Sequence, residues 1–178
     1  TDGRLRVGTA VRVNRAVVEH DRTLVVGPVL PHEVVGFSGG TKYLFPGVSG
    51  QEMIDLPHWV GALVTSPEII GTPGPTPVRA LIDRAAALLR RPVDAACVVT
   101  EPGSQRLHSV AMGEVHQAWV SAVAVSAATH VRYLDAPMAR VLSLVSTRYD
   151  DLWTGAKGFY KVEPVVADGG QVGLYAPP

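Results

Sequence analysis

The sequence contains a single cysteine, Cys97, so an internal disulfide is excluded. Cys97 stands in the apolar run over residues 95–99, where a cysteine is usually a small buried residue of the core. A chain that uses cysteine only in this way fits a reducing compartment, and we expect a cytoplasmic protein.

Charged residues are also scarce. They make up 18% of the chain, and sixteen basic residues are balanced by sixteen acidic ones. This balance argues against a nucleic-acid binder, which must neutralise phosphates, and against a polybasic membrane patch. The sequence has no apolar run of about eighteen residues and no N-terminal signal pattern. We therefore expect neither nucleic acid nor a membrane as a partner.

Apolar and turn-forming residues are abundant instead. Hydrophobic residues account for 47% of the chain, with 18 glycines and 14 prolines, a composition typical of a compact α/β protein with many tight turns. The pattern predicts extended segments over residues 11–13, 16–18 and 24–30, a long shaped loop over 31–50, and helices over 51–63 and 77–90. The second helix has Thr76 as its N-cap and Pro77 at its first position.

After residues 91–92 a second series begins. It predicts a strand over 95–100, a hairpin-like return over 106–111, a helix over 113–128, strands over 131–134 and 141–145, a helix over 150–161 and a strand over 171–175. Strands that alternate with helices indicate an α/β fold with mixed or mostly parallel sheets. We expect two lobes, which meet near residues 91–94 and share a cleft for a cofactor and a substrate.

The residues that carry chemistry gather in the loop over residues 31–47, directly after a nearly all-apolar strand, where α/β sheets bind their ligands. Ser38, Gly39 and Gly40 can turn backbone N–H groups towards an anion, and Lys42 can add a positive charge. Together they would cradle a phosphate or a carboxylate. The loop lacks the glycine and lysine spacing of nucleoside-triphosphate and dinucleotide sites.

A histidine stands on each side of Lys42: His32 precedes it and His58 follows it. Residues 32–47 read H-x3-G-F-S-G-G-x-K-x3-P-G, and this pattern, followed by His58, resembles the signature of the nickel-pincer-dependent lactate racemase family. Members of that family are racemases and epimerases of 2-hydroxy acids. The resemblance is strong over residues 11–60 and looser over residues 94–176.

The resemblance implies a role for each of these residues. Lys42 matches the lysine that binds the cofactor covalently through a thioamide, and His58 matches the histidine ligand of the nickel. The implied cofactor is pyridinium-3-thioamide-5-thiocarboxylic acid mononucleotide, whose sulfur arms and ring carbon hold nickel in a square-planar set completed by one imidazole. His32 matches one of two acid/base histidines, which we expect to titrate near neutrality because each gives and takes a proton.

A second motif, over residues 150–157, resembles the part of the family's second lobe that faces the substrate. Trp153 keeps an aromatic residue, and Lys157 matches a lysine that we assign both to substrate binding and to catalysis. Thr154 is also assigned to substrate binding, although the lactate-specific members have glutamine at this position. The shorter side chain would open space near the substrate, so we expect a lactate-like 2-hydroxy acid of undetermined identity. Further on, Asp168-Gly169-Gly170 predicts a turn before the last strand.

The family's second acid/base histidine, with the Asp and Arg residues that hold the nucleotide, belongs to a segment preceding Thr1. His20 does not match it, because residues 18–22 read as an exposed turn. We expect residues 1–92 to be the C-terminal part of an N-terminal cofactor-binding lobe, and residues 93–178 to be the first part of the second lobe. Such a central fragment would be inactive alone. The cofactor-synthesis enzymes are expected partners.

Two other functions remain open. The first alternative is a binding or assembly module that keeps the fold without catalysis. The second is a metal hydrolase that uses His32 and His58 with a carboxylate such as Glu33 or Asp55. The remaining histidines have no metal-ligand spacing and are interpreted as structural: His108, His116 and His130. Trp119 belongs to an apolar stripe with Val115, Ala122 and Val123 and is expected in the core.

Overall fold

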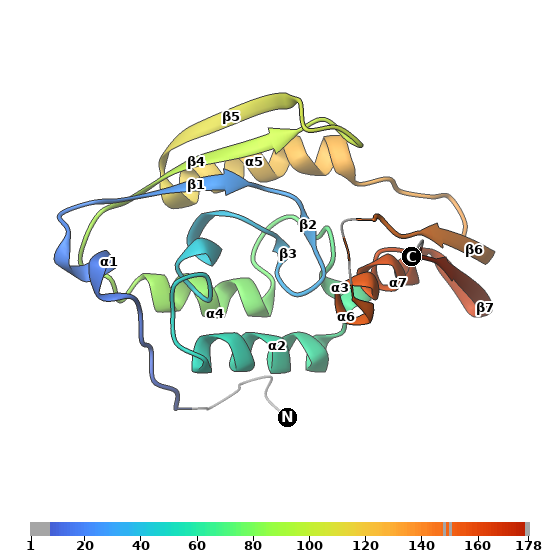
Figure 1. Cartoon of the computed structure of the whole chain (residues 1–178), viewed down its shortest axis with the longest axis horizontal. Coiled ribbons are helices and arrows are strands. Elements are labelled where there is room, and N and C mark those ends of the chain that lie inside the picture. Colours follow the sequence, from blue (N-terminus) through green and yellow to red (C-terminus); the bar gives the residue numbers. More distant parts are fainter. Residues whose placement is uncertain (1–7, 148, 150, 177–178) are drawn as a thin grey trace.

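The computed structural model describes residues 8–147, 149 and 151–176, with the backbone alone at Trp153. Its central sheet has the strand order β1-β4-β5 and consists of β1 (Thr23–Pro28), β4 (Val93–Thr100) and β5 (Leu107–Glu114) (Figure 1). β1 and β4 are parallel, with Val25 opposite Ala95, and β5 returns antiparallel to β4. The predicted mixed α/β class and the predicted hairpin are confirmed.

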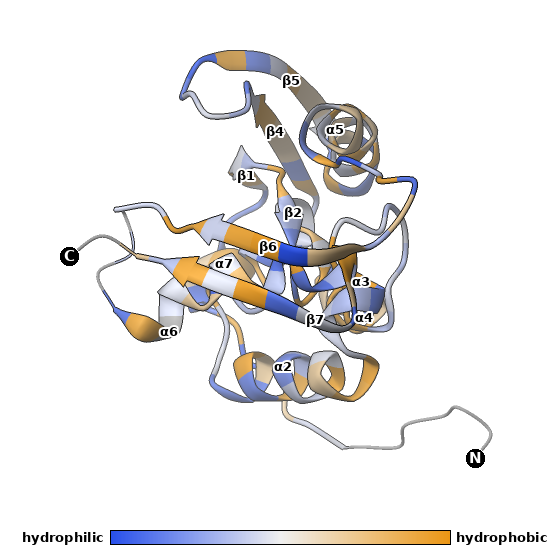
Figure 2. Cartoon of the chain, turned by 90° about the vertical axis from the view of Figure 1, so that its right-hand side faces the viewer, coloured by the Kyte–Doolittle hydropathy of each residue, from blue (hydrophilic) through white to orange (hydrophobic). Residues whose placement is uncertain are grey.

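Helix α5 (Val115–His130) follows β5 and packs along β4 and β5 (Figures 1 and 2). The Glu114 side chain caps it by accepting the N–H groups of His116 and Gln117, each at 3.0 Å. Its buried stripe contains the predicted core residues: Val115, Trp119, Ala122 and Val123. Burial of this stripe against the sheet is the main apolar contribution of the helix to stability.

Two further helices lie below the sheet in Figure 1, α2 (Glu52–Val64) packed on α4 (Pro77–Ala86), while the short α3 (Ser66–Ile69) joins them. The Thr76 hydroxyl accepts the N–H of Arg79 at 3.1 Å, which confirms the predicted N-cap. α4 ends earlier than the pattern indicated, so Leu88 lies beyond it and is 64% exposed.

The long loop between β1 and α2 contains the short antiparallel strands β2 (Pro31–His32) and β3 (Gly36–Phe37), followed by the 3₁₀ helix η1 (Gly40–Tyr43). η1 lies between α4 and α5 and contacts both. The loop is thus held from two sides by helices that are far from it in the sequence.

The last part of the chain forms a parallel pair, β6 (Met138–Leu144) and β7 (Val166–Tyr175). Between these strands lie α6 (Leu152–Gly155), α7 (Lys157–Tyr160) and the 3₁₀ helix η2 (Glu163–Val165). The helix predicted over 150–161 is therefore two short helices, and Asp150 lies outside the described residues. Asp168-Gly169-Gly170 lies inside β7, where the pairing register with β6 shifts, and not before the strand.

Two predicted strands are wrong. Residues 131–134 form no strand and connect α5 to β6. Residues 16–18 belong to the helix α1 (Arg15–Glu19), whose first turn is stabilised by Asn14, because its side chain accepts the N–H of Ala16 at 3.0 Å. A good N-cap here outweighs the strand preference of two valines.

The lobe boundary predicted between residues 92 and 93 does not coincide with a division between sheets. β4 follows Pro92 directly and pairs with β1, and the core joins buried residues from both sides, including Val29, Phe37, Val99 and Trp119. The sequence Arg91-Pro92 is typical of a linker between domains, but the next residue, Val93, is the first residue of strand β4 in the central sheet. Among the described helices, none is long and apolar enough to cross a membrane.

Candidate functional site

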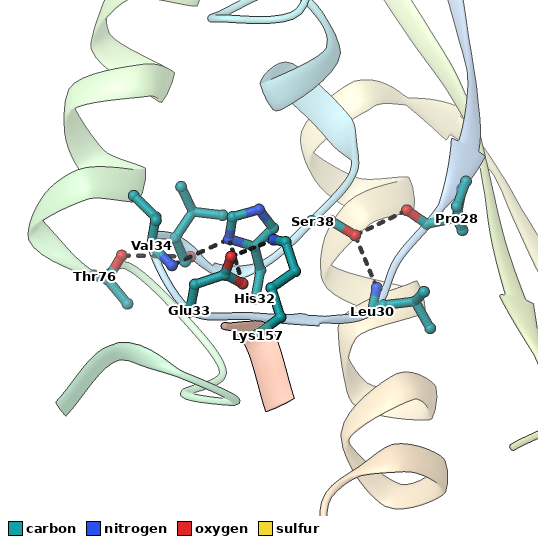
Figure 3. Close-up of polar contacts among 9 residues, drawn as sticks. Pro28, Leu30, His32, Glu33, Val34, Ser38, Thr76 and Lys157 are labelled. Carbon is teal, nitrogen blue, oxygen red and sulfur yellow. Dashed lines mark hydrogen bonds and ion pairs between the residues drawn. The ribbon is translucent and has the colours of Figure 1, made fainter. Parts of the chain in front are cut away.

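His32 and Glu33 lie at the end of β2 and the start of the turn to β3 (Figure 3). The His32 side chain is 20% exposed, and its Nδ1 accepts the backbone N–H of Val34 at 3.1 Å. In the neutral tautomer that accepts this bond, the imidazole carries its proton on Nε2; to take up a proton at Nε2 the ring must carry its own proton on Nδ1 instead. Nε2 is therefore the nitrogen left to face a substrate.

Lys42 lies in η1, and burial lowers the pKa of its amine. The positive charges of Lys157 and Arg79 lower it further, while the carboxylate of Glu33 opposes the shift. A lower pKa increases the fraction of neutral amine at a given pH, and neutral amine is the nucleophilic form.

The Ser38-Gly39-Gly40 segment is held by hydrogen bonds within the chain. The Ser38 hydroxyl donates to Pro28 O at 3.0 Å and accepts the N–H of Leu30 at 2.9 Å (Figure 3). Its backbone N–H donates to Leu30 O at 2.8 Å. Ser38 therefore fixes the loop to the end of β1, and its contact with a cofactor stays a prediction.

Arg79 and Trp119 hold the same segment from the other side, a role that sequence reasoning missed. The Arg79 guanidinium, 1% exposed, donates to Gly39 O at 3.0 Å and lies 3.7 Å from the centroid of the Trp119 ring. Trp119 Nε1 donates to Ser38 O at 2.9 Å. An arginine in an apolar helix face is the only sequence signal of this arrangement, because a buried guanidinium needs partners.

His58 lies on the exposed side of α2, and its Nδ1 donates to Ile54 O at 2.6 Å. This bond fixes the ring and leaves the Nε2 lone pair available. Metal-binding histidines commonly donate their second nitrogen to a backbone carbonyl in this way. The arrangement of His58 therefore fits the predicted nickel ligand.

The second motif contributes Lys157, at the start of α7. Its ammonium group forms an ion pair with Glu33 Oε1, and the Glu33 side chain is 14% exposed (Figure 3). Thr154, in α6, donates its hydroxyl to the carboxylate of Asp151 at 2.9 Å, and Trp153 lies in the same helix. Through its ion pair with Glu33, Lys157 contacts the turn that contains His32.

The predicted residues act on one another electrostatically. Burial lowers the pKa of His32 to about 4, the charges of Lys42, Lys157 and His58 lower it as well, and Glu33 opposes the shift. The structure thus brings together side chains from β2, η1, α2 and α7. A pKa of about 4 differs from the near-neutral titration expected from the sequence, because the site buries the imidazole among cations.

The other histidines lie apart from this group. His20 is exposed at the end of α1, and its Nδ1 contacts Ala16 O at 2.9 Å. His108 and His116 are exposed on β5 and α5. Within the described ranges, no group of three or more His, Cys, Asp or Glu side chains is arranged to hold a metal. The hydrolase alternative therefore has no compact ligand set in this part of the chain.

Comparisons with known proteins bear on the first part of the chain and on the fold. Residues 2–69 match the lactate racemase N-terminal domain. A search of curated proteins found no match. Among solved structures, a Thermotoga maritima protein from a structural genomics consortium is 31% identical over 91% of this chain, with a TM-score of 0.78.

The lactate racemase apoprotein of Thermoanaerobacterium thermosaccharolyticum is 21% identical over 92% of this chain, with a TM-score of 0.79, a likeness of fold. This chain spans 41% of the Thermotoga maritima protein and 39% of the racemase.

Proposed function

We propose that the protein racemises or epimerises a lactate-like 2-hydroxy acid with a covalently attached nickel-pincer nucleotide, on the basis that residues 2–69 match the lactate racemase N-terminal domain. The observation that carries the proposal is the ion pair of Lys157 with Glu33, which joins the second motif to the turn that contains His32. Lys42, His58, His32 and Lys157 each have a distinct role in the proposed site.

Lys42 and His58 would hold the cofactor. The lowered pKa of Lys42 supports covalent attachment through its amine, and the fixed ring of His58 supports nickel ligation through Nε2. Lys42 follows Gly39 and Gly40 in the chain and lies in η1, next to the backbone predicted to bind an anion. When bound, the nickel-pincer nucleotide accepts a hydride from the substrate carbon and returns it.

His32 would move the proton of the substrate hydroxyl at Nε2. Its low exposure keeps bulk water from competing for this position. Lys157 would attract the substrate carboxylate, and Trp153 and Thr154 stay the other residues predicted to bind the substrate. Inversion follows when the carbon is reduced from the opposite face.

The proposal is tested with a 2-hydroxy acid deuterated at C2 and the protein that carries this chain, produced together with the cofactor-synthesis enzymes. Hydride transfer predicts an inverted product that retains deuterium. His32→Gln should lower the inversion rate by about two to four orders of magnitude, as expected for loss of a general acid/base. His116→Gln, on the exposed side of α5, is the control.

Inversion with loss of deuterium to solvent would contradict hydride transfer, and undiminished inversion in the His32 variant would contradict its role. Metal analysis of the same sample separates the alternatives. Stoichiometric zinc without nickel favours a hydrolase, while absence of any cofactor favours a non-catalytic module.

A further inference from the structure

Glu33 is a buried carboxylate that neither the sequence motif nor the proposed reaction uses. Its side chain is 14% exposed, so its negative charge needs partners. The two oxygens face different groups: Oε1 pairs with the ammonium of Lys157, and Oε2 lies 3.6 Å from His32 Nδ1 (Figure 3). The carboxylate therefore stands between the imidazole and the amine.

His32 Nδ1 has two neighbours with opposite requirements. The N–H of Val34, at 3.1 Å, needs a lone pair on Nδ1, whereas the carboxylate of Glu33, with Oε2 at 3.6 Å, needs a proton on Nδ1 to accept a hydrogen bond from it. Nδ1 carries a proton in two forms of the ring: the neutral tautomer with a free lone pair on Nε2, and the imidazolium. In both forms Nδ1 cannot accept the hydrogen bond from the Val34 N–H. In both of these forms Glu33 Oε2 is the acceptor placed beside Nδ1.

The charges around His32 also single out Glu33 as the group that favours a protonated ring. Lys42 on η1, His58 on α2 and Lys157 on α7 all oppose a proton on the ring, and Glu33 is the neighbour that favours it. The pairing with Lys157 holds Glu33 ionised, because the lysine and the His32 interaction lower the pKa of Glu33 against the effect of burial.

We propose that Glu33 is a positioning residue for His32: its carboxylate accepts a hydrogen bond from Nδ1–H while Nε2 exchanges a proton with the substrate, and Lys157 holds the carboxylate in place. The role rests on the proposed function of His32. In the forward step the substrate O–H bond breaks and an N–H bond forms at Nε2. The oxygen electron pair forms the carbonyl as C2 gives up its hydride to the cofactor, and Glu33 stays ionised.

The test follows the ring nitrogens of His32 by NMR during a pH titration of the whole chain without cofactor. Glu33→Gln should move the His32 midpoint to lower pH, by about one pH unit, because the favourable carboxylate charge is lost. Lys157→Met should move the midpoint to higher pH, because a positive charge that opposes protonation of His32 is lost. Glu68→Gln, exposed on α3, should leave it unchanged.

An unchanged or raised midpoint in Glu33→Gln, or a lowered midpoint in Lys157→Met, would overturn the role of Glu33. If Glu33→Gln does not fold, Glu33→Asp replaces it: the charge is kept but the shorter side chain draws the carboxylate away from Nδ1, so the midpoint should fall, and an unchanged midpoint would overturn the role of Glu33. The titration needs no cofactor, so its failure is distinguishable from a failure of the racemase function. In the active protein, Glu33→Gln should lower kcat and shift its pH profile, with KM nearly unchanged.

Discussion

Burial decides how His32 titrates. The turn between β2 and β3 removes the ring from water, and the surrounding charges of Lys42, Lys157 and His58 add to the effect. A buried neutral imidazole is available as a base without competition from solvent protons, but its protonated form is costly. The carboxylate of Glu33 is the group in the described site that reduces this cost.

The pKa of His32 makes the stability of the fold depend on pH. The pKa of His32 is about 4 in the folded chain, below the ordinary value of 6.5 for histidine. Between these two pH values the unfolded chain binds a proton that the folded chain does not. The free energy of unfolding therefore falls as the pH drops through this window, by about 2 kcal/mol at pH 5 from this group. Urea denaturation at pH 7 and pH 5 measures the loss.

The comparison uses His32→Asn, which removes the titrating group. Its loss of stability between the two pH values should be smaller than that of the unmutated chain, and His108→Asn, exposed on β5, should behave like the unmutated chain. An equal loss in the His32 variant would show that other groups cause the pH dependence.

At the scale of residues, the sequence predicted side chains that belong to recognisable motifs but missed the contacts that join distant parts of the chain. His32, Lys42 and His58 share a short segment with a recognisable spacing. Glu33 pairs with a lysine 124 residues away, and Arg79 reaches Gly39 O across 40 residues. Contacts of that range depend on the tertiary fold, and no local pattern encodes them.

Gly40 shows how the helices α4 and α5 determine the position of the 3₁₀ helix η1. Gly40 has a φ of 59°, and an added Cβ would lie 2.8 Å from Arg79 Nη2 and 3.0 Å from Trp119 Cβ. Both neighbours are fixed in the core by their own hydrogen bonds. η1, and with it Lys42, can approach α4 and α5 only because this side chain is absent.

We therefore expect Gly40→Ala to destabilise the fold more than backbone strain alone explains. Gly103 is the matched control, since its φ is 71° and an added Cβ would meet nothing within 4 Å. Each alanine should cost roughly 1 kcal/mol for the left-handed backbone, and Gly40→Ala about 1–3 kcal/mol more for overpacking. Thermal unfolding of the two variants measures the difference, and equal destabilisation would rule out the packing role.

Elements with strong local signals were predictable. Helix α4 has a capping threonine, a first-turn proline and an apolar stripe, and it begins where these place it. The segment around Val17 has a strand-like composition but begins with a capping asparagine, and it forms a helix. The domain boundary at residues 92/93 rested on a turn signal, which carries no information on which strands pair.

At the scale of the whole molecule, the pair of Glu33 and Lys157 connects the last part of the chain to the site. β6, β7 and α7 contribute few buried residues, and much of their apolar surface is exposed, including Leu142 at 68% and Leu144 at 72%. An ion pair with a buried partner therefore has a large share in holding α7 against the His32 turn.

Lys157→Met should loosen this connection. Limited proteolysis should then cut the connecting residues 131–137 several-fold faster than in the unmutated chain, because cleavage follows local opening. Lys161→Met, exposed after α7, removes the same charge without the pair and should leave the rate unchanged. Equal rates in the two variants would show that other contacts hold α7.

The central claim, that this site carries a nickel-pincer nucleotide, is tested most directly by peptide mass spectrometry of the chain produced with the cofactor-synthesis enzymes. The account predicts a thioamide-linked nucleotide on the peptide that contains Lys42, absent from Lys42→Arg and retained in Lys161→Arg. A chain that carries no adduct on Lys42, although the cofactor is being made, would contradict it.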